Sequence, residues 1–499
     1  MVRALLSVHD KTGIAALARG LRSLGWELIA SGNTSRLLTE EGIDHVDVAT
    51  VTGSPEMLGG RVKTLHPKIH GGILADRSKP EHLADLVANG IVAIDLVVSN
   101  LYPFRAEPSV EMIDIGGPTM VRAAAKNHGH VGILVNPEDY GPVLDEIRLD
   151  GKLSEATRKR LARAAFAHTA AYDAAIVDWF DDDEALPPTI HLALERVQEL
   201  RYGENPHQEG ARYRAIGGSS FWDDIEVHGA MALSYLNLYD AEAAWRLAYD
   251  LGDGPVAVIV KHANPCGVGV ASSLSDAYRL AFECDERSAF GGIVAVNQIL
   301  DAATVDAMVE AAQADVVIAP SYADGVIEAL ARKRRNTRVI TAAPPVSAAR
   351  DYRQIDGGFL VQEAHHFESV RDAWRVVTKR APTEAEWTDA ELAWRICGHV
   401  KSNAIVLVKS GQAVGIGAGQ QNRVESGLIA STKAAGRAKG GACASDAFYP
   451  FPDGVEAAAE SGAAVVVQPG GALHDDEVIA RADELGLAMV FTGERHFLH

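Results

Sequence analysis

Two groups of side chains in this sequence could do chemistry, and the first is a lysine followed directly by a histidine. Lys261 and His262 come after the apolar run 256–260 and before the turn-forming residues 264–267. That order predicts a buried strand that ends at two basic side chains and a Pro/Gly turn. Cover by neighbouring elements would lower the pKa of the lysine and keep the histidine neutral, which suits proton transfer near pH 7. On spacing alone, however, an ordinary solvated loop is the commoner arrangement for such a pair.

The second group begins with a basic loop, residues 61–72. It holds three Lys or Arg and two His but no carboxylate, in a chain whose net charge is −20. This local reversal of sign indicates a site for an anion. Two small polar loops, residues 9–13 and 31–35, follow predicted strands, and their N–H groups and hydroxyls are suited to hold a phosphate. Taken singly, each of these loops is also typical of an ordinary helix N-cap.

A phenol, a carboxylate and two more cations are predicted at the same place. Residues 94–100 predict a strand, and a following proline makes a rigid turn that fixes the phenol of Tyr102. Asp114 precedes a predicted helix that carries Arg122 and Lys126 one turn apart on one face. Ligands of parallel sheets collect where strands lead into helix N-termini. These side chains are therefore expected to meet over a bound phosphate.

The elements that must position these groups alternate between apolar strands and amphipathic helices. Strands are predicted at 4–8 and 26–30 with a helix between them, which is the pattern of a parallel α/β sheet. An acidic run with prolines, residues 181–188, marks a domain border near residue 190. Beyond it, a predicted helix at 384–400 and strand at 404–408 repeat the order of elements around residue 261. This repetition indicates a weak internal duplication of α/β units, with a Gly-rich turn after the second strand.

Composition excludes several classes of protein. A chain of 499 residues predicts two to four domains. No apolar stretch approaches the ~20 residues needed to cross a bilayer, and the N-terminus turns polar too early for a signal peptide, so a cytoplasmic location is expected. The net charge of −20 should repel nucleic acid and anionic membranes. The four cysteines are scattered without a C-x-x-C pair, which argues against disulfides and a structural zinc site.

Five features of the first part are the segments at residues 51–57, 61–72, 100–104, 113–117 and 123–127. Together these segments resemble the cyclohydrolase domain of the PurH family of bifunctional purine-biosynthesis enzymes. The resemblance implies that residues 1–190 form a methylglyoxal-synthase-like α/β domain that closes the second purine ring with loss of water. The residues implied to surround the reacting formamide and carboxamide are Lys63, Tyr102, Asp114 and Lys126. Those implied to hold the nucleotide phosphate are Ser7, Lys11, Ser31, Gly32, Thr34, Arg61 and Thr64.

Three features depart from the family pattern. Asn33 replaces a second glycine, His9 stands where serine is usual, and the segment 105–112 is short. Asparagine tolerates left-handed backbone geometry, so the first change is expected to preserve the loop. The short segment leaves less chain than usual for the lid over the cyclohydrolase site.

Six segments of the second part resemble the formyltransferase domain of the same family. They are residues 200–208, 261–267, 288–292, 400–404, 415–423 and 445–451. The resemblance implies that residues 191–499 form two cytidine-deaminase-like α/β subdomains without zinc, at about 200–370 and 371–499. It also implies a homodimer in which each transferase site is built from both subunits.

The catalytic residues that the resemblance implies for the transferase are Lys261, His262 and Asn403. His262 would take a proton from the aminoimidazole amine, a weak nucleophile because its lone pair is delocalised. Lys261 and Asn403 would orient the formyl group and stabilise the oxyanion of the tetrahedral intermediate. Further substrate contacts are implied for Arg201, Tyr202, Asn237, Gly292, Asp315, Arg423, Phe448 and Arg495.

The expected function is therefore that of a bifunctional enzyme of purine biosynthesis. It would formylate 5-aminoimidazole-4-carboxamide ribonucleotide (AICAR), with 10-formyltetrahydrofolate as cosubstrate and without a catalytic metal. It would then cyclise the formylated product (FAICAR) to IMP. The expected partners are these small molecules and a second copy of the chain, with no nucleic acid and no membrane.

Other functions compete with this expectation. A zinc-dependent nucleobase deaminase needs an acid and a second thiolate, but this chain has Asn264 and Gly269 at those places. A nucleotide-binding regulatory protein with degenerate sites is disfavoured because both groups keep their reactive side chains. A nicotinamide enzyme is rejected because residues 415–420 lack the last glycine of the dinucleotide fingerprint.

Overall fold

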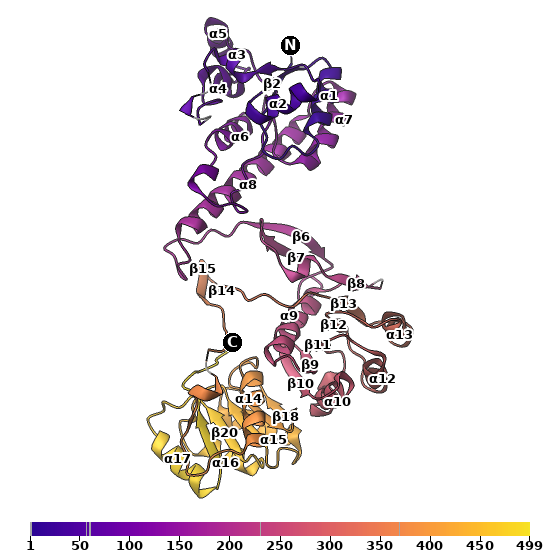
Figure 1. Ribbon diagram of the computed structural model, residues 1–499, viewed down its shortest axis with the longest axis vertical. Coiled ribbons are helices and arrows are strands. Elements are labelled where there is room, and N and C mark those ends of the chain that lie inside the picture. The colour runs from indigo at the N-terminus through magenta and orange to yellow at the C-terminus, as the bar shows by residue number, and fades with distance from the viewer. Residues whose placement is uncertain (1, 56, 59–60, 230, 369) are drawn as a thin grey trace. The chain divides into compact units, whose positions relative to one another are not determined.

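The computed structural model describes residues 2–55, 57–58, 61–229, 231–368 and 370–499. Glu56, which belongs to the family-like segment 51–57, lies outside the described residues. The chain divides into two compact units (Figure 1). The first comprises Met1–Leu194 with Ala215–Gly217, and the second comprises Glu195–Arg214 with Gly218–His499.

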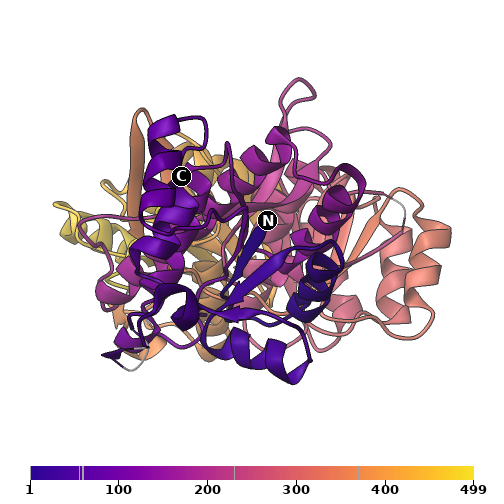
Figure 2. The same ribbon diagram turned by 90° about the horizontal axis from the view of Figure 1, so that it is seen from above.

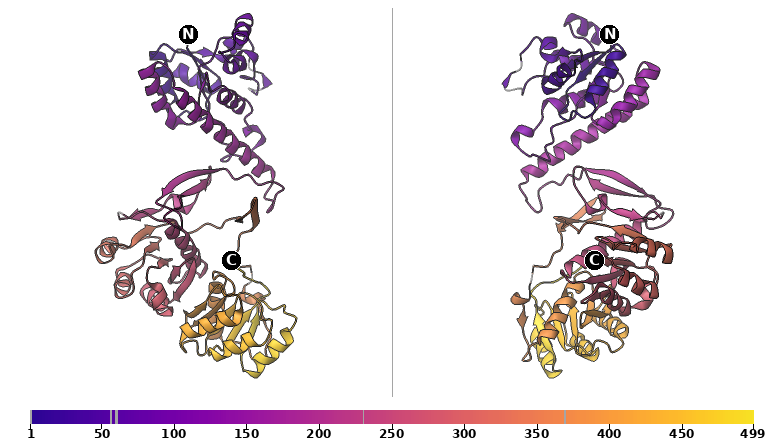
Figure 3. Two further views of the ribbon diagram at one scale, coloured as in Figure 1. Left: turned by 180° about the vertical axis from the view of Figure 1, so that it is seen from behind. Right: turned by 45° about the vertical axis from the view of Figure 1, so that its right-hand side comes forward.

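Within the described residues, the first unit holds a five-stranded parallel sheet in the order β3-β2-β1-β4-β5. Its strands are β1 (Arg3–Leu6), β2 (Glu27–Ala30), β3 (Val46–Asp47), β4 (Leu96–Val98) and β5 (Gly132–Leu134). Its helices are α1 (Ile14–Ser23), α2 (Gly32–Glu40), α3 (Val48–Thr52), α4 (Pro67–Leu74), α5 (Pro80–Ala88), α6 (Gly116–Lys126), α7 (Tyr140–Asp150) and α8 (Glu155–Phe180). The strand at the N-terminus lies in the middle of this unit with helices at its sides (Figure 2), and α8 is its long helix (Figure 3). The predicted parallel α/β sheet is confirmed.

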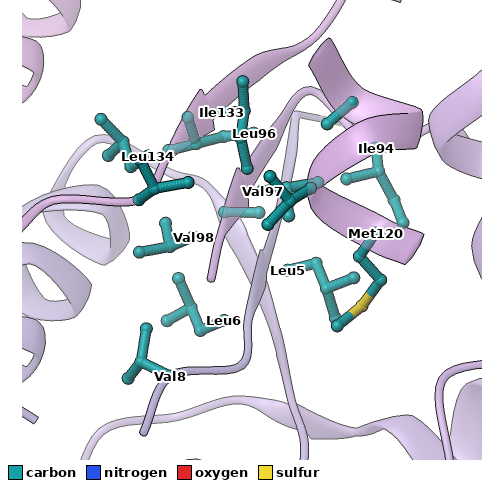
Figure 4. Packing of buried hydrophobic residues seen from close by; sticks show 14 of the residues in the cluster. Leu5, Leu6, Val8, Ile94, Leu96, Val97, Val98, Met120, Ile133 and Leu134 are labelled. Carbon is teal, nitrogen blue, oxygen red and sulfur yellow. The ribbon is translucent and has the colours of Figure 1, made fainter. Parts of the chain in front are cut away.

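The strands of this sheet are apolar because helices pack against them. Leu5, Leu6, Val97 and Val98 are fully buried, and Met120 of α6 packs against the same core (Figure 4). Burying each such side chain contributes roughly 1.5–3 kcal/mol to folding. The buried layer holds the carboxyl ends of β1, β2 and β4 side by side, and polar loops begin there.

The second unit is built on a larger sheet, which has twelve strands in the described part of the chain, ordered β16-β21-β20-β19-β17-β18-β10-β9-β11-β12-β13-β8. Its first six strands along the chain are β8 (Glu226–His228), β9 (Val256–Lys261), β10 (Asn264–Val270), β11 (Ile293–Val296), β12 (Val316–Ala319) and β13 (Arg338–Thr341). The others are β16 (Arg375–Val376), β17 (Ile405–Lys409), β18 (Gln412–Gly417), β19 (Ala442–Ser445), β20 (Val465–Gln468) and β21 (Ala488–Phe491). Two small sheets pair β6 (Leu194–Leu200) with β7 (Gly210–Ala215), and β14 (Arg350–Ile355) with β15 (Gly358–Glu363).

The large sheet consists of two halves with the same order of elements. The first half, residues 226–341, adds α9 (Tyr235–Asp250), α10 (Leu274–Cys284), α11 (Glu286–Ala289), α12 (Ala302–Glu310) and α13 (Val326–Lys333). The second half, residues 375–491, adds α14 (Glu384–Cys397), α15 (Arg423–Ala434), α16 (Asp453–Glu460) and α17 (Asp475–Glu484). Apart from the short α11, each half runs strand, helix, two-stranded hairpin, and then three helix–strand units. The predicted internal duplication is confirmed, and the antiparallel pair β10–β18 joins the halves.

Glycines in both hairpins lie within strands. The predicted turn at residues 264–267 is wrong, whereas the predicted Gly-rich turn after the strand 404–408 is present at Ser410–Gly411. Residues 264–267 belong to β10, and residues 415–417 belong to β18. A β-carbon on Gly267 would lie 1.9 Å from the backbone oxygen of Ala281 in α10, and one on Gly415 would lie 2.0 Å from that of Ala430 in α15. The glycines are therefore needed because a helix backbone packs directly on each strand. In the sequence alone, glycines at such positions resemble turn residues.

The described residues can be compared with three features that the composition argued against: membrane-spanning helices, metal sites and disulfides. No described helix is long and apolar enough to span a membrane. Among the same residues, no group of three or more His, Cys, Asp or Glu is placed to hold a metal ion. The four cysteines are free thiols in buried positions, and burial raises the pKa of Cys266 and Cys284 to about 12.

Candidate active sites

The first site lies at the carboxyl ends of β1 and β2. The hydroxyl oxygens of Ser7 and Ser31 are 2.9 Å apart. The hydroxyl of Thr34 donates to the backbone oxygen of Val8 and accepts from its N–H, both at 3.1 Å. Three predicted phosphate-holding hydroxyls thus gather where the loop after β1 meets the start of α2.

Two lysines reach this place from different segments. The ammonium of Lys11 donates to the backbone oxygens of Val8 and His9, and burial lowers its pKa. Gly32 opens α2 with a φ of +53°, and a β-carbon there would lie only 3.1 Å from Nζ of Lys63. Because the start of a helix attracts anions, the two ammonium groups and the N–H groups of α2 together suit a phosphate-bearing ligand.

Asn100, two residues after β4, holds the neighbouring loop. Its side-chain oxygen accepts from the N–H groups of His9 and Asp10 at 2.6 and 2.9 Å, and its amide donates to the oxygen of Asp10 at 3.0 Å. The ring of His9 then meets the ring of Tyr102 edge to face, with centroids 5.4 Å apart. Asn100 was part of a family-like segment, but its role as the clamp of this loop was not predicted.

The carboxyl group of Asp114 lies at the start of α6. It accepts from the N–H of Gly117 at 2.9 Å, and burial raises its pKa. The backbone N–H of Asp114 donates to the hydroxyl of Tyr172 on α8 at 2.7 Å, a contact that sequence patterns did not indicate. A β-carbon on Gly116 would lie 3.0 Å from the hydroxyl of Thr64, so the basic loop also meets this helix start.

The two predicted cations of α6, Arg122 and Lys126, lie away from the start of the helix. Lys126 is the last residue of the helix, ten residues after Gly116, and a rise of 1.5 Å per residue places it about 15 Å away. The guanidinium of Arg122 packs over the ring of Phe166 on α8, 5.4 Å from its centroid. The expectation that Arg122 faces a phosphate is therefore wrong, because this face of α6 packs against α8.

Arg61 of the basic loop forms an ion pair with Glu111, and both side chains are exposed. Glu111 belongs to the short segment 105–112 that departs from the family pattern. This pairing brings that segment over the basic loop.

The second site centres on the turn between β9 and β10. His262 and Ala263 form this turn, with φ values of +55° and +53°. The carboxylate of Asp240 on α9 accepts from the N–H of His262 at 3.1 Å and from that of Ala263 at 2.8 Å. The ammonium of Lys261 donates to the backbone oxygen of Phe290 at 2.7 Å. The turn is thus fixed from two sides.

Burial at this turn differs from the sequence-based expectation. The strand β9 is buried as predicted, but Lys261 is only half-buried and His262 is exposed. The predicted desolvation of the histidine is therefore wrong for a single chain, because nothing in the described part of the second unit covers the tip of the hairpin.

Three further predicted residues lie beside this hairpin. Gly292 and Asp315 precede β11 and β12, and the N–H of Asp315 donates to the oxygen of Gly292 at 2.9 Å. Strand β11 pairs with the end of β9, so both residues are at the same edge of the sheet as the turn. Asn237 lies in the first turn of α9, where its side-chain oxygen accepts from the N–H of Ser234 at 3.1 Å.

A buried polar network holds the second group of predicted transferase residues. The guanidinium of Arg423 donates to the side-chain oxygen of Asn403 at 2.7 Å, to Asp446 at 2.9 Å and to the backbone oxygen of Phe448 at 3.1 Å. Asp446 is fully buried, and burial raises its pKa although Arg423 opposes that shift. The hydroxyl of Ser402 also donates to this carboxylate. The roles of Asp446 and Ser402 were not predicted.

A pocket of about 330 Å³ opens beside this network. It is lined by Ser402, Asn403, Gly419, Gln420, Gln421, Phe497 and His499. The guanidinium of Arg495 stacks on the ring of Phe497, 4.4 Å from its centroid. The backbone N–H of Lys401 donates to the side-chain oxygen of Asn264 at 3.0 Å, which ties the rim of the pocket to the β9–β10 hairpin.

Comparisons with known proteins identify the family. The profile of the AICARFT/IMPCHase bienzyme matches residues 124–433, and that of the MGS-like domain matches residues 13–127. The chain is 50% identical to the bifunctional purine biosynthesis protein PurH of Synechococcus elongatus, over 99% of both chains. It is 48% identical to PurH of Roseobacter denitrificans, over 100% of this chain and 98% of that protein, and 45% identical to PurH of Bacillus subtilis, over 100% and 99%. The chain belongs to the PurH family.

As a PurH protein it is a bifunctional enzyme of purine biosynthesis, with AICAR formyltransferase and IMP cyclohydrolase activities. Its first unit has the MGS-like α/β fold, and an α/β region of the bienzyme family follows. The formyl donor of the transferase is 10-formyltetrahydrofolate.

Two predicted substrate contacts of this PurH chain lie outside the large sheet. Arg201 and Tyr202 lie in the loop between β6 and β7, where the guanidinium packs over the phenol ring, 5.4 Å from its centroid. The loop is closed by a hydrogen bond from the N–H of Gly203 to the oxygen of Gln208 at 2.7 Å.

Proposed function

We propose that the two activities are divided between two domains, the cyclohydrolase at residues 1–190 and the formyltransferase at residues 191–499. Within the latter, subdomains at about 200–370 and 371–499 correspond to the two halves of the large sheet. The observation that carries this proposal is the separation of the reactive groups. Lys63 and Asp114 belong to the first unit, whereas His262 and Arg423 belong to the second.

For ring closure, the first site holds the ribotide phosphate and supplies acid, base and charge. The hydroxyls of Ser7, Ser31 and Thr34 with the Lys11 ammonium hold the phosphate; Gly32, Arg61 and Thr64 complete its surroundings. The carboxamide nitrogen attacks the formyl carbon, and Lys63 stabilises the alkoxide that forms. Asp114, whose pKa is raised by burial, exchanges protons with the departing water, assisted by Tyr102. Lys126, at the other end of α6, adds positive charge at longer range.

For formyl transfer, the second site removes a proton from a weak nucleophile. The AICAR amine bonds to the formyl carbon, and His262 takes the amine proton. The bond from that carbon to the folate nitrogen then breaks, and the proton passes to this nitrogen, so that tetrahydrofolate leaves neutral at that atom. Lys261 and Asn403 donate to the oxyanion of the intermediate. Arg423 and Phe448 contact the substrate, as do Arg201, Tyr202, Asn237, Gly292, Asp315 and Arg495. The pocket with its amide side chains and the ring of Phe497 suits a flat heterocycle such as that of the folate.

The transferase works as a homodimer in this proposal, with each site built from both chains. Three strand steps separate β9 from β17, which is about 14 Å at the usual strand spacing. His262 is exposed in the single chain, and large apolar side chains near it are exposed too: Tyr235 by 39%, Tyr239 by 50% and Phe290 by 65%. A second copy that covers this surface would desolvate His262 and supply the Asn403 group from the other chain.

A cytoplasmic location accords with this function. The four free, buried thiols suit a reducing compartment. The lysines named above provide the positive charge that oxyanions need, so neither step in this proposal uses a catalytic metal.

The test is to assay each half reaction in Lys63→Ala and His262→Ala. Lys63→Ala is expected to lose cyclisation and keep formyl transfer, and His262→Ala is expected to do the reverse, each by roughly 10²–10⁴-fold. Ser410→Ala is the matched control for His262→Ala, because Ser410 occupies the same turn position in the second hairpin. Loss of both activities in either folded variant would contradict the division between two sites.

A further inference from the structure

The two hairpins of the second unit have the same construction. In the first, Lys261 pairs with Asn264 across a two-residue turn; in the second, Lys409 pairs with Gln412. Both turns are left-handed, with φ values of +55° and +53° in the first and +51° and +80° in the second. Both lysines donate to a backbone oxygen just before the next strand: Lys261 to that of Phe290, three residues before β11, at 2.7 Å, and Lys409 to that of Gly440, two residues before β19, at 2.8 Å.

An aspartate from the preceding helix lies under each turn. Asp240 of α9 is six residues after the N-cap Ser234, and Asp389 of α14 is six residues after the N-cap Thr383. Both carboxylates are buried, with 9% and 3% of the residue exposed. Since both helices begin with a capping box, the two aspartates occupy equivalent places in the duplicated fold.

The contacts of the two aspartates differ where the turns differ. In the second hairpin the turn is Ser410-Gly411. There Asp389 accepts one backbone bond, from Gly411 at 3.3 Å, and lies 3.9 Å from the ammonium of Lys409. In the first the turn is His262-Ala263, and Asp240 accepts two bonds, at 3.1 and 2.8 Å.

Glycine adopts positive φ without cost, whereas histidine and alanine do not. Two successive non-glycine residues at positive φ therefore need support from outside the turn, and the two oxygens of Asp240 provide it. Because the direction of a Cα–Cβ bond follows from the backbone, this support also sets where the His262 ring points.

We propose that Asp240 is a positioning residue for formyl transfer, which holds the strained turn so that His262 faces the AICAR amine. The proposal rests on the function proposed above for His262. Asp240 lies beneath the turn and acts through its two backbone N–H groups. In the second hairpin the corresponding aspartate serves only the fold, because its turn carries serine and glycine.

The test compares Asp240→Asn with Asp389→Asn in the full-length chain. Asparagine keeps the size of the side chain but replaces one acceptor oxygen by an amide that cannot accept. Asp240→Asn is expected to lower kcat for formyl transfer by roughly 10- to 100-fold, with little change in the KM for AICAR. Asp389→Asn is expected to keep formyl transfer within about twofold while lowering the melting temperature, because it removes the same kind of contact.

A third variant tests whether the turn is the link. Ala263→Gly relieves the strain at the second turn position and gives the first hairpin the glycine that the second already has. In the Asp240→Asn background it is expected to recover kcat severalfold, which the loss of a merely structural contact elsewhere would not explain. If Asp240→Asn alone does not fold, Ala263→Gly with and without Asp240→Asn gives the same comparison on a relaxed turn.

Three results would overturn the proposal: formyl transfer that is unchanged in Asp240→Asn, an equal loss of it in Asp389→Asn, or no recovery with Ala263→Gly. The His262→Ala assay separates this failure from failure of the proposed function. If His262→Ala abolishes formyl transfer while Asp240→Asn does not, only the positioning role falls. If His262→Ala retains formyl transfer, the role of the histidine falls as well.

Discussion

The β9–β10 and β17–β18 hairpins share a backbone, a lysine and a supporting aspartate, but only the first carries a histidine. Lys261 and Lys409 make the same bond to a backbone oxygen, so a lysine at this position serves the duplicated fold. The hairpins differ in the two turn residues and in the 3.9 Å ion pair between Lys409 and Asp389, which has no counterpart between the described side chains of Lys261 and Asp240. If the proposed function holds, the chemistry of the first hairpin depends on the turn residues that follow a lysine with the same structural bond in both hairpins.

The largest expected difference between the halves concerns this lysine. Lys261→Ala should lower formyl transfer by roughly 10²–10³-fold, because it removes a donor to the oxyanion. Lys409→Ala should leave formyl transfer unchanged. In urea unfolding, Lys261→Ala should lose about 1 kcal/mol for one hydrogen bond, and Lys409→Ala should lose more, because it also removes the ion-pair partner of the buried Asp389 carboxylate. An equal loss of activity in Lys409→Ala would show that the lysine acts through the fold in both halves.

The next comparison should show no difference. A β-carbon would meet a helix backbone oxygen at 1.9 Å on Gly267 and at 2.0 Å on Gly415. Gly267→Ala and Gly415→Ala should each destabilise the second unit by about 1–3 kcal/mol or more, since backbone has to move. Urea unfolding followed by tryptophan fluorescence measures both. Tolerance of one change but not the other would mean that the halves are not packed alike.

A histidine cluster should make the second half sensitive to acid. His496 is 1% exposed; its ring nitrogen lies 2.5 Å from that of His365, and its ring packs on Trp394. Burial, together with the neighbouring His365 and His399, lowers the pKa of His496 to about 3. In the unfolded chain the pKa is about 6.5, so between those values only the unfolded state takes up the proton.

The contribution of His496 to the free energy of unfolding is therefore fully present above pH ~6.5, and it decreases as the pH drops towards 3. His496→Phe keeps the aromatic packing but cannot titrate, so its unfolding free energy should depend less on pH between 7 and 5. Denaturant unfolding at several pH values measures this dependence. An unchanged pH dependence in the variant would exclude His496 as its source.

The smallest effect is expected from Ala263→Gly alone. Ala263 has a positive φ of +53°, so glycine relieves strain there, while the buried methyl group is lost. These effects oppose each other, and the net change in unfolding free energy should stay within about 1 kcal/mol. Gly411→Ala, in contrast, should destabilise clearly, because its β-carbon would lie 2.5 Å from the oxygen of Val270. Equal effects of the two changes, measured by thermal unfolding, would contradict the strain assigned to the first turn.

Sequence patterns predicted the elements better than their endings. Apolar runs such as residues 256–260 predicted strands because burial leaves a local trace. Gly267 was interpreted as a turn residue, because the helix that requires a bare backbone is found only in the tertiary structure. Periodicity carries no signal for such a contact.

The candidate sites show the same limit. Resemblance to a family supplied Asn403 and Arg423 separately, and their bond at 2.7 Å became visible only in the structure. Asp240 is 22 residues from His262, and Tyr172 is 58 residues from Asp114. Residues that support a site without touching its ligand have ordinary types at ordinary spacings, so neither motif nor composition distinguishes them.

The ends of the twelve-stranded sheet have a consequence for aggregation. Unpaired edge strands invite other chains to add to a sheet, and long flat edges are the most exposed to this. Here the edge strands are β8, with three residues, and β16, with two. Because these edge strands are short, they expose few unpaired backbone N–H and C=O groups to which a strand of another chain could bind. A large, strongly apolar sheet can thus remain free of fibre-like growth and leave contact with other molecules to its side chains.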